Sequence, residues 1–192
     1  MTFHSDIPLL PFSSQKKWRS WLSKNFDRVD GIWMLLYKKD SGVKSITYDE
    51  ALEEALCFGW IDGLRKKYDE KSYIQKFTPR RKRSIWSKRN RTKVEKLIKE
   101  GKMHNAGLAE VKKAKNDGRW DKAYDSHTTM KIPDDFVKEL SKYPEALAFF
   151  KTLNKTNLYS IGFRLQTAKK PETRQKRMQS IIDMMKQGKK FH

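Results

Sequence analysis

The stretch from Thr47 to Asn90 constrains the fold more than any other part of the chain, because three kinds of local structure follow one another within it. It opens with a helix signal. Thr47 and Glu50 have the spacing of a capping box, in which each side chain satisfies a backbone N–H at the start of a helix. Apolar residues occupy one broad arc of this helix. The polar arc holds Glu50, Glu53, Glu54 and Cys57.

A β-hairpin is expected after this helix. Gly59 or Gly63 can end the helix, since glycine readily adopts the left-handed conformation found at helix ends. Residues 64–68 and 73–78 then flank Asp69-Glu70-Lys71-Ser72, a pattern that predicts two strands joined by a turn. Thr78-Pro79 ends the second strand.

The third element is a helix predicted to begin near Ser84 and to end at Gly101. On its wheel, Ser87 and Asn90 fall in the middle of the apolar face that contains Trp86. Polar side chains in such a place need hydrogen-bond partners. They belong either to a local structural network or to a small polar site.

A candidate binding site can be assembled around these two polar residues. Trp60 and Asp62 can complete it from the start of the hairpin, where Asp62 is otherwise read as a turn-forming residue. Arg80 or Arg83 can complete it from the segment before the helix, whose start offers N–H groups and partial positive charge to phosphate or carboxylate. The candidate binding residues are Trp60, Asp62, Arg80, Arg83, Ser84, Trp86, Ser87 and Asn90.

The remaining elements predict the α+β fold class. Residues 32–39 (IWMLLYKK) are apolar at odd and even positions, as in a strand covered on both faces. From Pro133 the pattern is wholly helical, and its last apolar stripe consists of Met178, Ile181, Ile182 and Met185. We predict a small, mostly antiparallel sheet with flanking helices in a domain of residues 1–126. A helical C-terminal subdomain of residues 127–192 is expected to pack on it.

Several motifs of unusual composition occur in one order: ALCFGWIDG, FTPR, SIWSKRN, AKNDGRW and AKKPETRQKR. In order and spacing they resemble the YdeI/OmpD-associated family, also called the bacteriocin-protection family, over residues 18–188. The resemblance implies a small bacterial α+β protein, loosely tied to outer-membrane proteins and to bacteriocin or peptide stress. It carries no catalytic residue over to this chain.

Positive charge is concentrated in two segments of a chain whose formal net charge is +20. Residues 64–93 hold 13 Lys and Arg against 2 acidic residues, and residues 154–192 hold 10 against 2. Such density favours an anionic ligand carrying phosphate or carboxylate, a nucleic acid, or an anionic membrane surface. A highly charged surface with no cognate anion is the alternative.

The sequence argues against several kinds of site. Scattered histidines and a single cysteine give no metal-ligand spacing, so neither a metal nor a cofactor is expected. Cys57 shares its helix face with glutamates, whose charge disfavours the thiolate. No Gly-rich phosphate loop, signal peptide or membrane-spanning run is recognisable. A reducing cytoplasm is therefore the expected location.

These observations favour a cytoplasmic, non-enzymatic binding or stress-protection protein with a basic anion-binding surface. One alternative is a nucleic-acid-binding module that uses residues 64–93 and 154–192, because aromatic residues interleave with the charges of the first segment. The other alternative is an enzyme of unknown reaction, with its site at Trp60, Asp62, Ser87 and Asn90. No residue is assigned a catalytic role.

Overall fold

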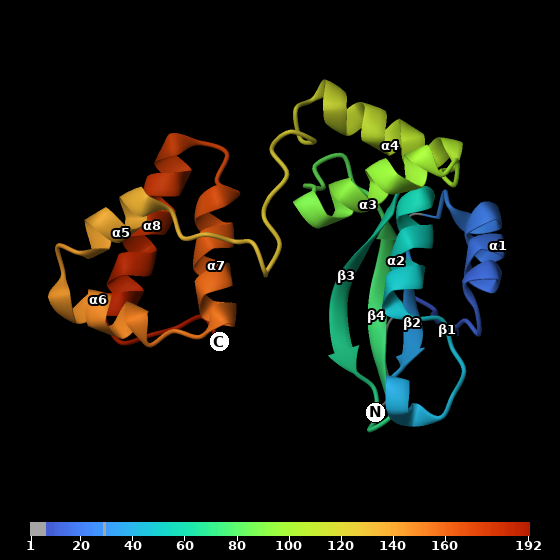
Figure 1. Cartoon of the computed structure of the whole chain (residues 1–192), viewed down its shortest axis with the longest axis horizontal. Coiled ribbons are helices and arrows are strands. Elements are labelled where there is room, and N and C mark those ends of the chain that lie inside the picture. The colour runs from blue at the N-terminus through green and yellow to red at the C-terminus, as the bar shows by residue number, and fades with distance from the viewer. Residues whose placement is uncertain (1–6, 29) are drawn as a thin grey trace. The chain divides into compact units, whose positions relative to one another are not determined.

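The computed structural model describes residues 7–28 and 30–192, and in this part of the chain it contains one four-stranded sheet and eight α-helices (Figure 1). The fold class is α+β, as predicted, with a helical C-terminal part. The chain divides into two compact units. The first comprises the described residues up to Trp86 together with Asn90–Lys122, and the second comprises Ser87–Arg89 and Ala123–His192. The predicted boundary after residue 126, and the packing of the C-terminal part on the first domain, stay predictions.

The sheet of the first unit has the strand order β1-β2-β4-β3. β1 (Leu9–Pro11) runs parallel to β2 (Ile32–Tyr37). β2 pairs antiparallel with β4 (Ser72–Pro79), which pairs antiparallel with β3 (Trp60–Lys67). The sheet is therefore mostly antiparallel, and β3 forms one of its edges.

Both strands of the predicted hairpin are present, and the first begins at Trp60, four residues earlier than the sequence suggested. Gly59, with φ +76°, ends the preceding helix in the left-handed conformation that glycine adopts easily. Asp62 lies inside β3 opposite Phe77, so its interpretation as a turn-forming residue is wrong. The strand continues through Asp62 because β4 is long enough to pair with it.

Helices cover the sheet of the first unit. They are α1 (Gln15–Asn25), α2 (Tyr48–Cys57), α3 (Lys88–Lys99) and α4 (Asn105–Asn116), with a 3₁₀ turn, η1 (Lys39–Ser41). α2 contacts α1, α4 and β3, so it is covered on more than one side. The capping box at its start is present: Thr47 and Glu50 satisfy one another's backbone N–H groups.

The predicted polar arc of α2 is only partly correct. Glu54 is 5% exposed and Cys57 is 1% exposed. α1 covers this arc, and from it Arg19 Nη1 donates to Glu54 Oε2 at 2.7 Å while Gln15 Nε2 donates to Glu54 Oε1 at 2.8 Å. The buried carboxylate is thus held by one charged and one neutral donor, as a buried charge requires.

The second unit is built from α5 (Asp134–Leu140), α6 (Pro144–Lys151), α7 (Lys155–Gln166) and α8 (Pro171–Lys186). Its core contains residues of all four helices, and the predicted stripe of α8 lies within it. The buried residues of this core are Phe136, Leu140, Ala146, Ile161, Leu165, Met178, Ile181, Ile182 and Met185.

Candidate anion-binding site

The candidate site in the first unit is centred on two buried tryptophans, Trp86 and Trp120. Their rings meet edge to face, with centroids 4.9 Å apart. The guanidinium carbon of Arg80 lies 3.5 Å from the centroid of the Trp86 ring, and Arg80 is only 7% exposed. A cation stacked on a ring where little water screens it gains strongly from the ring's negative face. Arg80 is therefore fixed in place by its packing.

Three further basic side chains surround the tryptophan pair. Arg119 Nη1 donates to the Ser84 carbonyl at 2.8 Å, and Arg91 Nη1 donates to the Trp120 carbonyl at 3.3 Å. The Lys115 ammonium lies 5.6 Å from the centroid of the Trp120 ring. Together these residues form what we name the tryptophan–arginine cluster (Arg80, Trp86, Arg91, Lys115, Arg119 and Trp120).

Part of this positive charge is paired. Arg119 Nε lies 2.7 Å from a carboxylate oxygen of Asp117, and Arg91 Nε lies 3.6 Å from one of Glu95. The cluster's four cations still outnumber these two carboxylates. The buried indole N–H of Trp86 has no hydrogen-bond partner among the described residues, and it offers a donor to an acceptor atom. This arrangement can hold an anion, and it contains no group placed to transfer a proton or attack a substrate.

The segment between Arg80 and the tryptophan pair is a turn rather than a helix. The Ser84 hydroxyl accepts from the Arg81 N–H at 2.9 Å, and the Ser84 N–H donates to the Arg81 carbonyl at 2.9 Å. Arg81, Lys82 and Arg83 are all exposed on this turn. The predicted basic segment is therefore solvent-facing at three of its four positions.

The predicted helix start at Ser84 is wrong, since α3 begins at Lys88. Ser87 instead forms an isolated parallel bridge with Tyr124, and the Lys88 N–H donates to the Tyr124 carbonyl at 2.8 Å. Because Ser84 serves the turn and the Lys88 N–H is engaged, the proposed anion site at a helix start containing Ser84 and Ser87 does not form.

Trp60 and Asp62 have structural partners outside the tryptophan–arginine cluster. The Trp60 indole N–H donates to the Phe26 carbonyl at 2.8 Å, and its ring stands edge-on to that of Trp21 with centroids 5.8 Å apart. Asp62 accepts a hydrogen bond from the Tyr48 hydroxyl at 2.7 Å. The structure thus brings Arg80, Ser84 and Trp86 together and leaves Trp60 and Asp62 in other contacts.

Ser87 and Asn90 are both buried, each 8% exposed, in keeping with their predicted place on an apolar face. Ser87 groups with the second unit and Asn90 with the first. Their predicted hydrogen bonds to residues 60–63 or 79–83 stay a prediction.

Sequence reasoning missed Arg119 and Trp120 as members of the site. The signal was present in the motif AKNDGRW, whose last two residues they are. Arg91 was counted only as diffuse charge next to the site. These residues come together with Trp86 through tertiary packing between segments about 30 residues apart, which periodicity along one helix does not reveal.

Cys57, the lone cysteine, is unsuited to nucleophilic chemistry. Its burial, together with the nearby Glu54 carboxylate, raises the pKa of the thiol to about 11. Sequence reasoning assigned this effect to neighbouring glutamates, whereas desolvation is the larger cause. Within residues 7–28 and 30–192, no group of three or more His, Cys, Asp and Glu side chains is placed to hold a metal ion.

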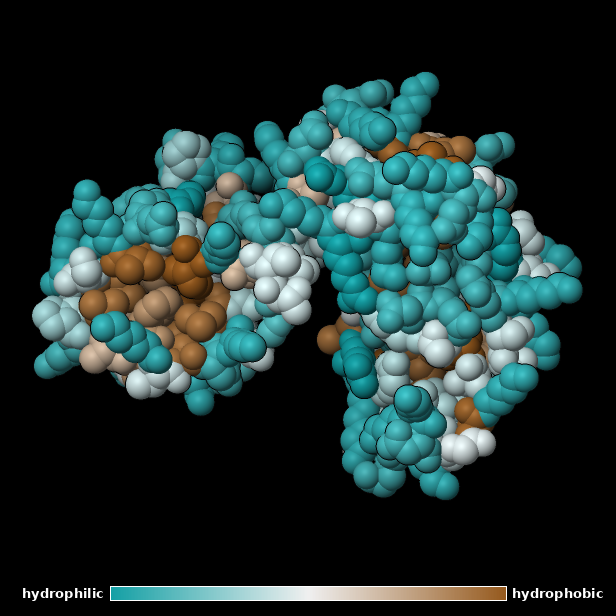
Figure 2. All heavy atoms as spheres, in the orientation of Figure 1, coloured by the Kyte–Doolittle hydropathy of each residue, from teal (hydrophilic) through white to brown (hydrophobic). Residues whose placement is uncertain are grey.

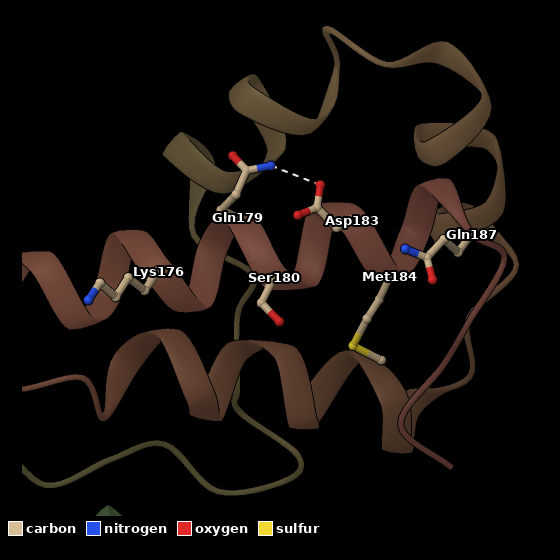
Figure 3. A pocket seen from close by; sticks show the side chains of 6 residues that line it. All are labelled: Lys176, Gln179, Ser180, Asp183, Met184 and Gln187. Atoms are coloured by element: carbon tan, nitrogen blue, oxygen red, sulfur yellow. Dashed lines mark hydrogen bonds between the residues drawn. The ribbon is translucent and has the colours of Figure 1, made fainter.

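The second unit has its own surface features. Figure 2 shows hydrophobic side chains gathered on the face of this unit that is turned to the viewer, at the left. A hollow of about 440 Å³ runs along α8 (Figure 3), bordered by Lys176, Gln179, Ser180, Asp183, Met184 and Gln187. Gln179 Nε2 donates to Asp183 Oδ1 at 2.9 Å. With one cation and one carboxylate on its border, this hollow has no charge preference. No helix of the described residues has the length and apolar character that crossing a bilayer requires.

Comparison with protein-family models gives two matches on separate parts of the chain. Residues 10–110 match a domain of unknown function (DUF8412). Residues 129–188 match the family described as Bacteriocin-protection, YdeI or OmpD-Associated, which confirms the resemblance noted in the sequence. Of the motifs behind that resemblance, AKKPETRQKR lies in this second match, whereas ALCFGWIDG and SIWSKRN lie in the first. No curated protein and no solved structure matches the chain.

Proposed function

Since the chain belongs to the DUF8412 family over its N-terminal half and carries a YdeI/OmpD-associated domain in its C-terminal part, we propose that it is a non-enzymatic, anion-binding protein of stress protection. Bacteriocin protection is the description of the C-terminal family, and we extend it to this chain as a protective role. The proposal places the protein in the cytoplasm, an assignment supported by its single cysteine, which can form no intramolecular disulfide.

The observation that carries the proposal is the exposure of cations along residues 64–93. Arg65, Lys66 and Lys67 are exposed on the edge strand β3, and Arg81–Arg83 are exposed on the turn after β4. The Arg65 guanidinium carbon lies 3.7 Å from the centroid of the Tyr73 ring, so part of this surface is held by stacking. We name these six cations the basic surface of residues 64–93. A field of this kind attracts polyanions without reading their sequence.

Two observations support a binding role over an enzymatic one. Cys57 keeps its proton at neutral pH, because burial raises the pKa of its thiol to about 11. Asp62, the carboxylate of the alternative enzyme site, accepts a hydrogen bond from Tyr48 at 2.7 Å. Both groups serve the packing of the first unit.

The test is a salt titration of heparin and duplex DNA binding by the full chain. Replacing Arg81 and Arg83 with glutamine is expected to lower affinity for both polyanions and to make the log–log salt slope less steep by roughly 1.8, at about 0.9 per phosphate lost. The matched control replaces Lys24 and Lys99, two exposed lysines of α1 and α3 that lie outside residues 64–93.

Equal losses in the test and control variants would reduce the binding to net charge alone and would overturn the assignment to this surface. Absence of binding at low salt would refute anion binding altogether. Strong preference for one DNA sequence at high salt would favour a dedicated nucleic-acid-binding module instead.

A further inference from the structure

A continuous groove lies between α7 and α8 of the second unit. It consists of two adjoining hollows of about 300 Å³ and 240 Å³ that share Arg164 and Arg177 in their walls. Tyr159 and Phe163 line the first hollow, and Lys176 and Phe191 line the second. We name these six residues the α7–α8 groove. It shares no residue with the basic surface of residues 64–93, so what it binds does not depend on the function proposed above.

The cations of the groove differ from their neighbours on the same helix. Arg174 forms an ion pair with Asp135 at 2.5 Å, and Lys186 lies 3.9 Å from Asp183. In the part of the chain that the structure describes, Arg164, Lys176 and Arg177 form no ion pair, and neither hollow is lined by a carboxylate. The groove therefore concentrates positive charge that the protein does not neutralise itself.

The two arginines of the groove are held in position by contacts that keep their charge. Arg177 Nη1 donates to the Arg164 carbonyl at 2.7 Å, which joins the two helices. The Arg164 guanidinium carbon lies 4.5 Å from the centroid of the Phe191 ring. A carbonyl and a ring face orient a guanidinium without cancelling its charge, so both side chains are positioned in advance for an anionic ligand.

Aromatic rings accompany these cations. Tyr159 and Phe163 lie with ring centroids 5.8 Å apart. His127 extends the row beyond Tyr159 at 5.0 Å, and Tyr124 extends it beyond Phe163 at 4.9 Å. Tyr159, Phe163 and Phe191 are half-buried, so each retains some surface open to solvent. The groove thus combines a cationic wall with partly exposed rings.

We propose that the α7–α8 groove binds single-stranded nucleic acid, with phosphates against Arg164, Lys176 and Arg177 and bases against the rings. Single strands are bound in this way elsewhere, by a positively charged groove whose aromatic side chains stack on unpaired bases. A duplex keeps its bases inside the stack, where such rings do not reach them. A membrane surface requires apolar side chains that protrude into the headgroup region, whereas these rings are half-buried in hollows.

The experiment measures binding of a short fluorescein-labelled oligothymidine to the full chain by fluorescence anisotropy, with inorganic polyphosphate as a second probe that has charge but no bases. Tyr159→Leu is expected to weaken oligothymidine binding about tenfold by removing a stacking ring. It should leave polyphosphate binding unchanged. Arg164→Gln with Lys176→Gln should weaken both probes and lower the oligothymidine salt slope by roughly 1.4, at about 0.7 per phosphate.

The matched control is Lys155→Gln with Lys189→Gln, which removes two exposed charges of the same unit away from the groove. Circular dichroism checks that each variant stays folded. Oligothymidine affinity unaffected by Tyr159→Leu, or lowered equally by the groove and control pairs, would overturn the proposal. Groove-dependent binding to phosphatidylserine vesicles or polyglutamate in place of oligothymidine would overturn it as well.

Discussion

At the scale of single residues, burial determines the chemistry of Cys57. The thiol is 1% exposed, and its pKa is raised from 9.0 to about 11 by desolvation and by the Glu54 carboxylate. Between these two pH values an unfolded chain loses the thiol proton while the folded chain keeps it. The unfolded state then binds fewer protons, so the contribution of Cys57 to stability is complete below about pH 9 and is lost as pH rises toward 11.

The same shift predicts slow alkylation of the native protein. At pH 8 the thiolate fraction of Cys57 should be about 100-fold lower than in the unfolded chain, because the pKa rises from 9.0 to about 11, and burial slows access further. Iodoacetamide labelling followed by mass spectrometry, with and without denaturing urea, measures this ratio. Labelling at equal rates in both states would show that Cys57 is accessible and ionised in the folded protein.

Gly107 of α4 gives a prediction whose sign separates packing from helix propensity. A Cβ built at this position would lie 2.2 Å from the Cys57 carbonyl oxygen, in the backbone of α2. Helix propensity alone makes Gly107→Ala stabilising, whereas the clash makes it destabilising by about 1–3 kcal/mol. Urea unfolding followed by tryptophan fluorescence decides between them. Exposed Ala109→Gly on the same helix reports propensity without the clash.

At the scale of elements, the start of α2 depends on its capping box. The Thr47 hydroxyl accepts from the Glu50 N–H at 3.3 Å, and Glu50 Oε2 accepts from the Thr47 N–H at 2.8 Å. Thr47→Ala should destabilise the first unit by about 1 kcal/mol in urea unfolding, because it removes the acceptor for an N–H that has no intrahelical partner. Ser14→Ala on α1 is the comparison, and its 3.4 Å cap bond predicts a smaller loss. A larger loss for Ser14→Ala would contradict this ranking.

The elements also show which parts of the fold follow from local sequence. The start of α2 and the hairpin were predictable, because their signals, a capping box and flanked turn residues, act within a few positions. The start of α3 was not, because Ser84 closes a turn with Arg81 and Trp86 packs on Trp120, whose partnership is set by the folded chain. The burial of Glu54 escaped prediction for the same reason, since α1 supplies the covering residues Gln15 and Arg19.

The candidate site divides along the same line. Arg80 and Trp86 were named from their proximity in sequence, and the structure stacks one on the other. Trp60 and Asp62 were added by analogy of position, and strand pairing gives them Phe26 and Tyr48 as partners instead. Arg119 enters through a hydrogen bond to Ser84 across 35 positions of sequence, a contact that no local pattern encodes.

At the scale of the whole molecule, the two units can be observed separately. All six tryptophans lie in the first unit, so tryptophan fluorescence reports on that unit alone. The second unit is helical in all its regular elements, and far-UV circular dichroism therefore follows both units together. Comparing the two signals during unfolding distinguishes one cooperative transition from two.

Removal of α8 should unfold the second unit, because this helix supplies four of the nine buried residues of its core: Met178, Ile181, Ile182 and Met185. A chain ending before Pro171 should lose more helical signal than α8 itself contains, since α5, α6 and α7 no longer have a core to pack against. Ile182→Ala is the graded version, with an expected loss of about 2–5 kcal/mol for a side chain buried completely. Gln175→Ala, at an exposed position of the same helix, should change stability by less than about 0.5 kcal/mol. A truncated chain with the melting temperature of the full protein would mean that the second unit folds without the stripe on which its core depends.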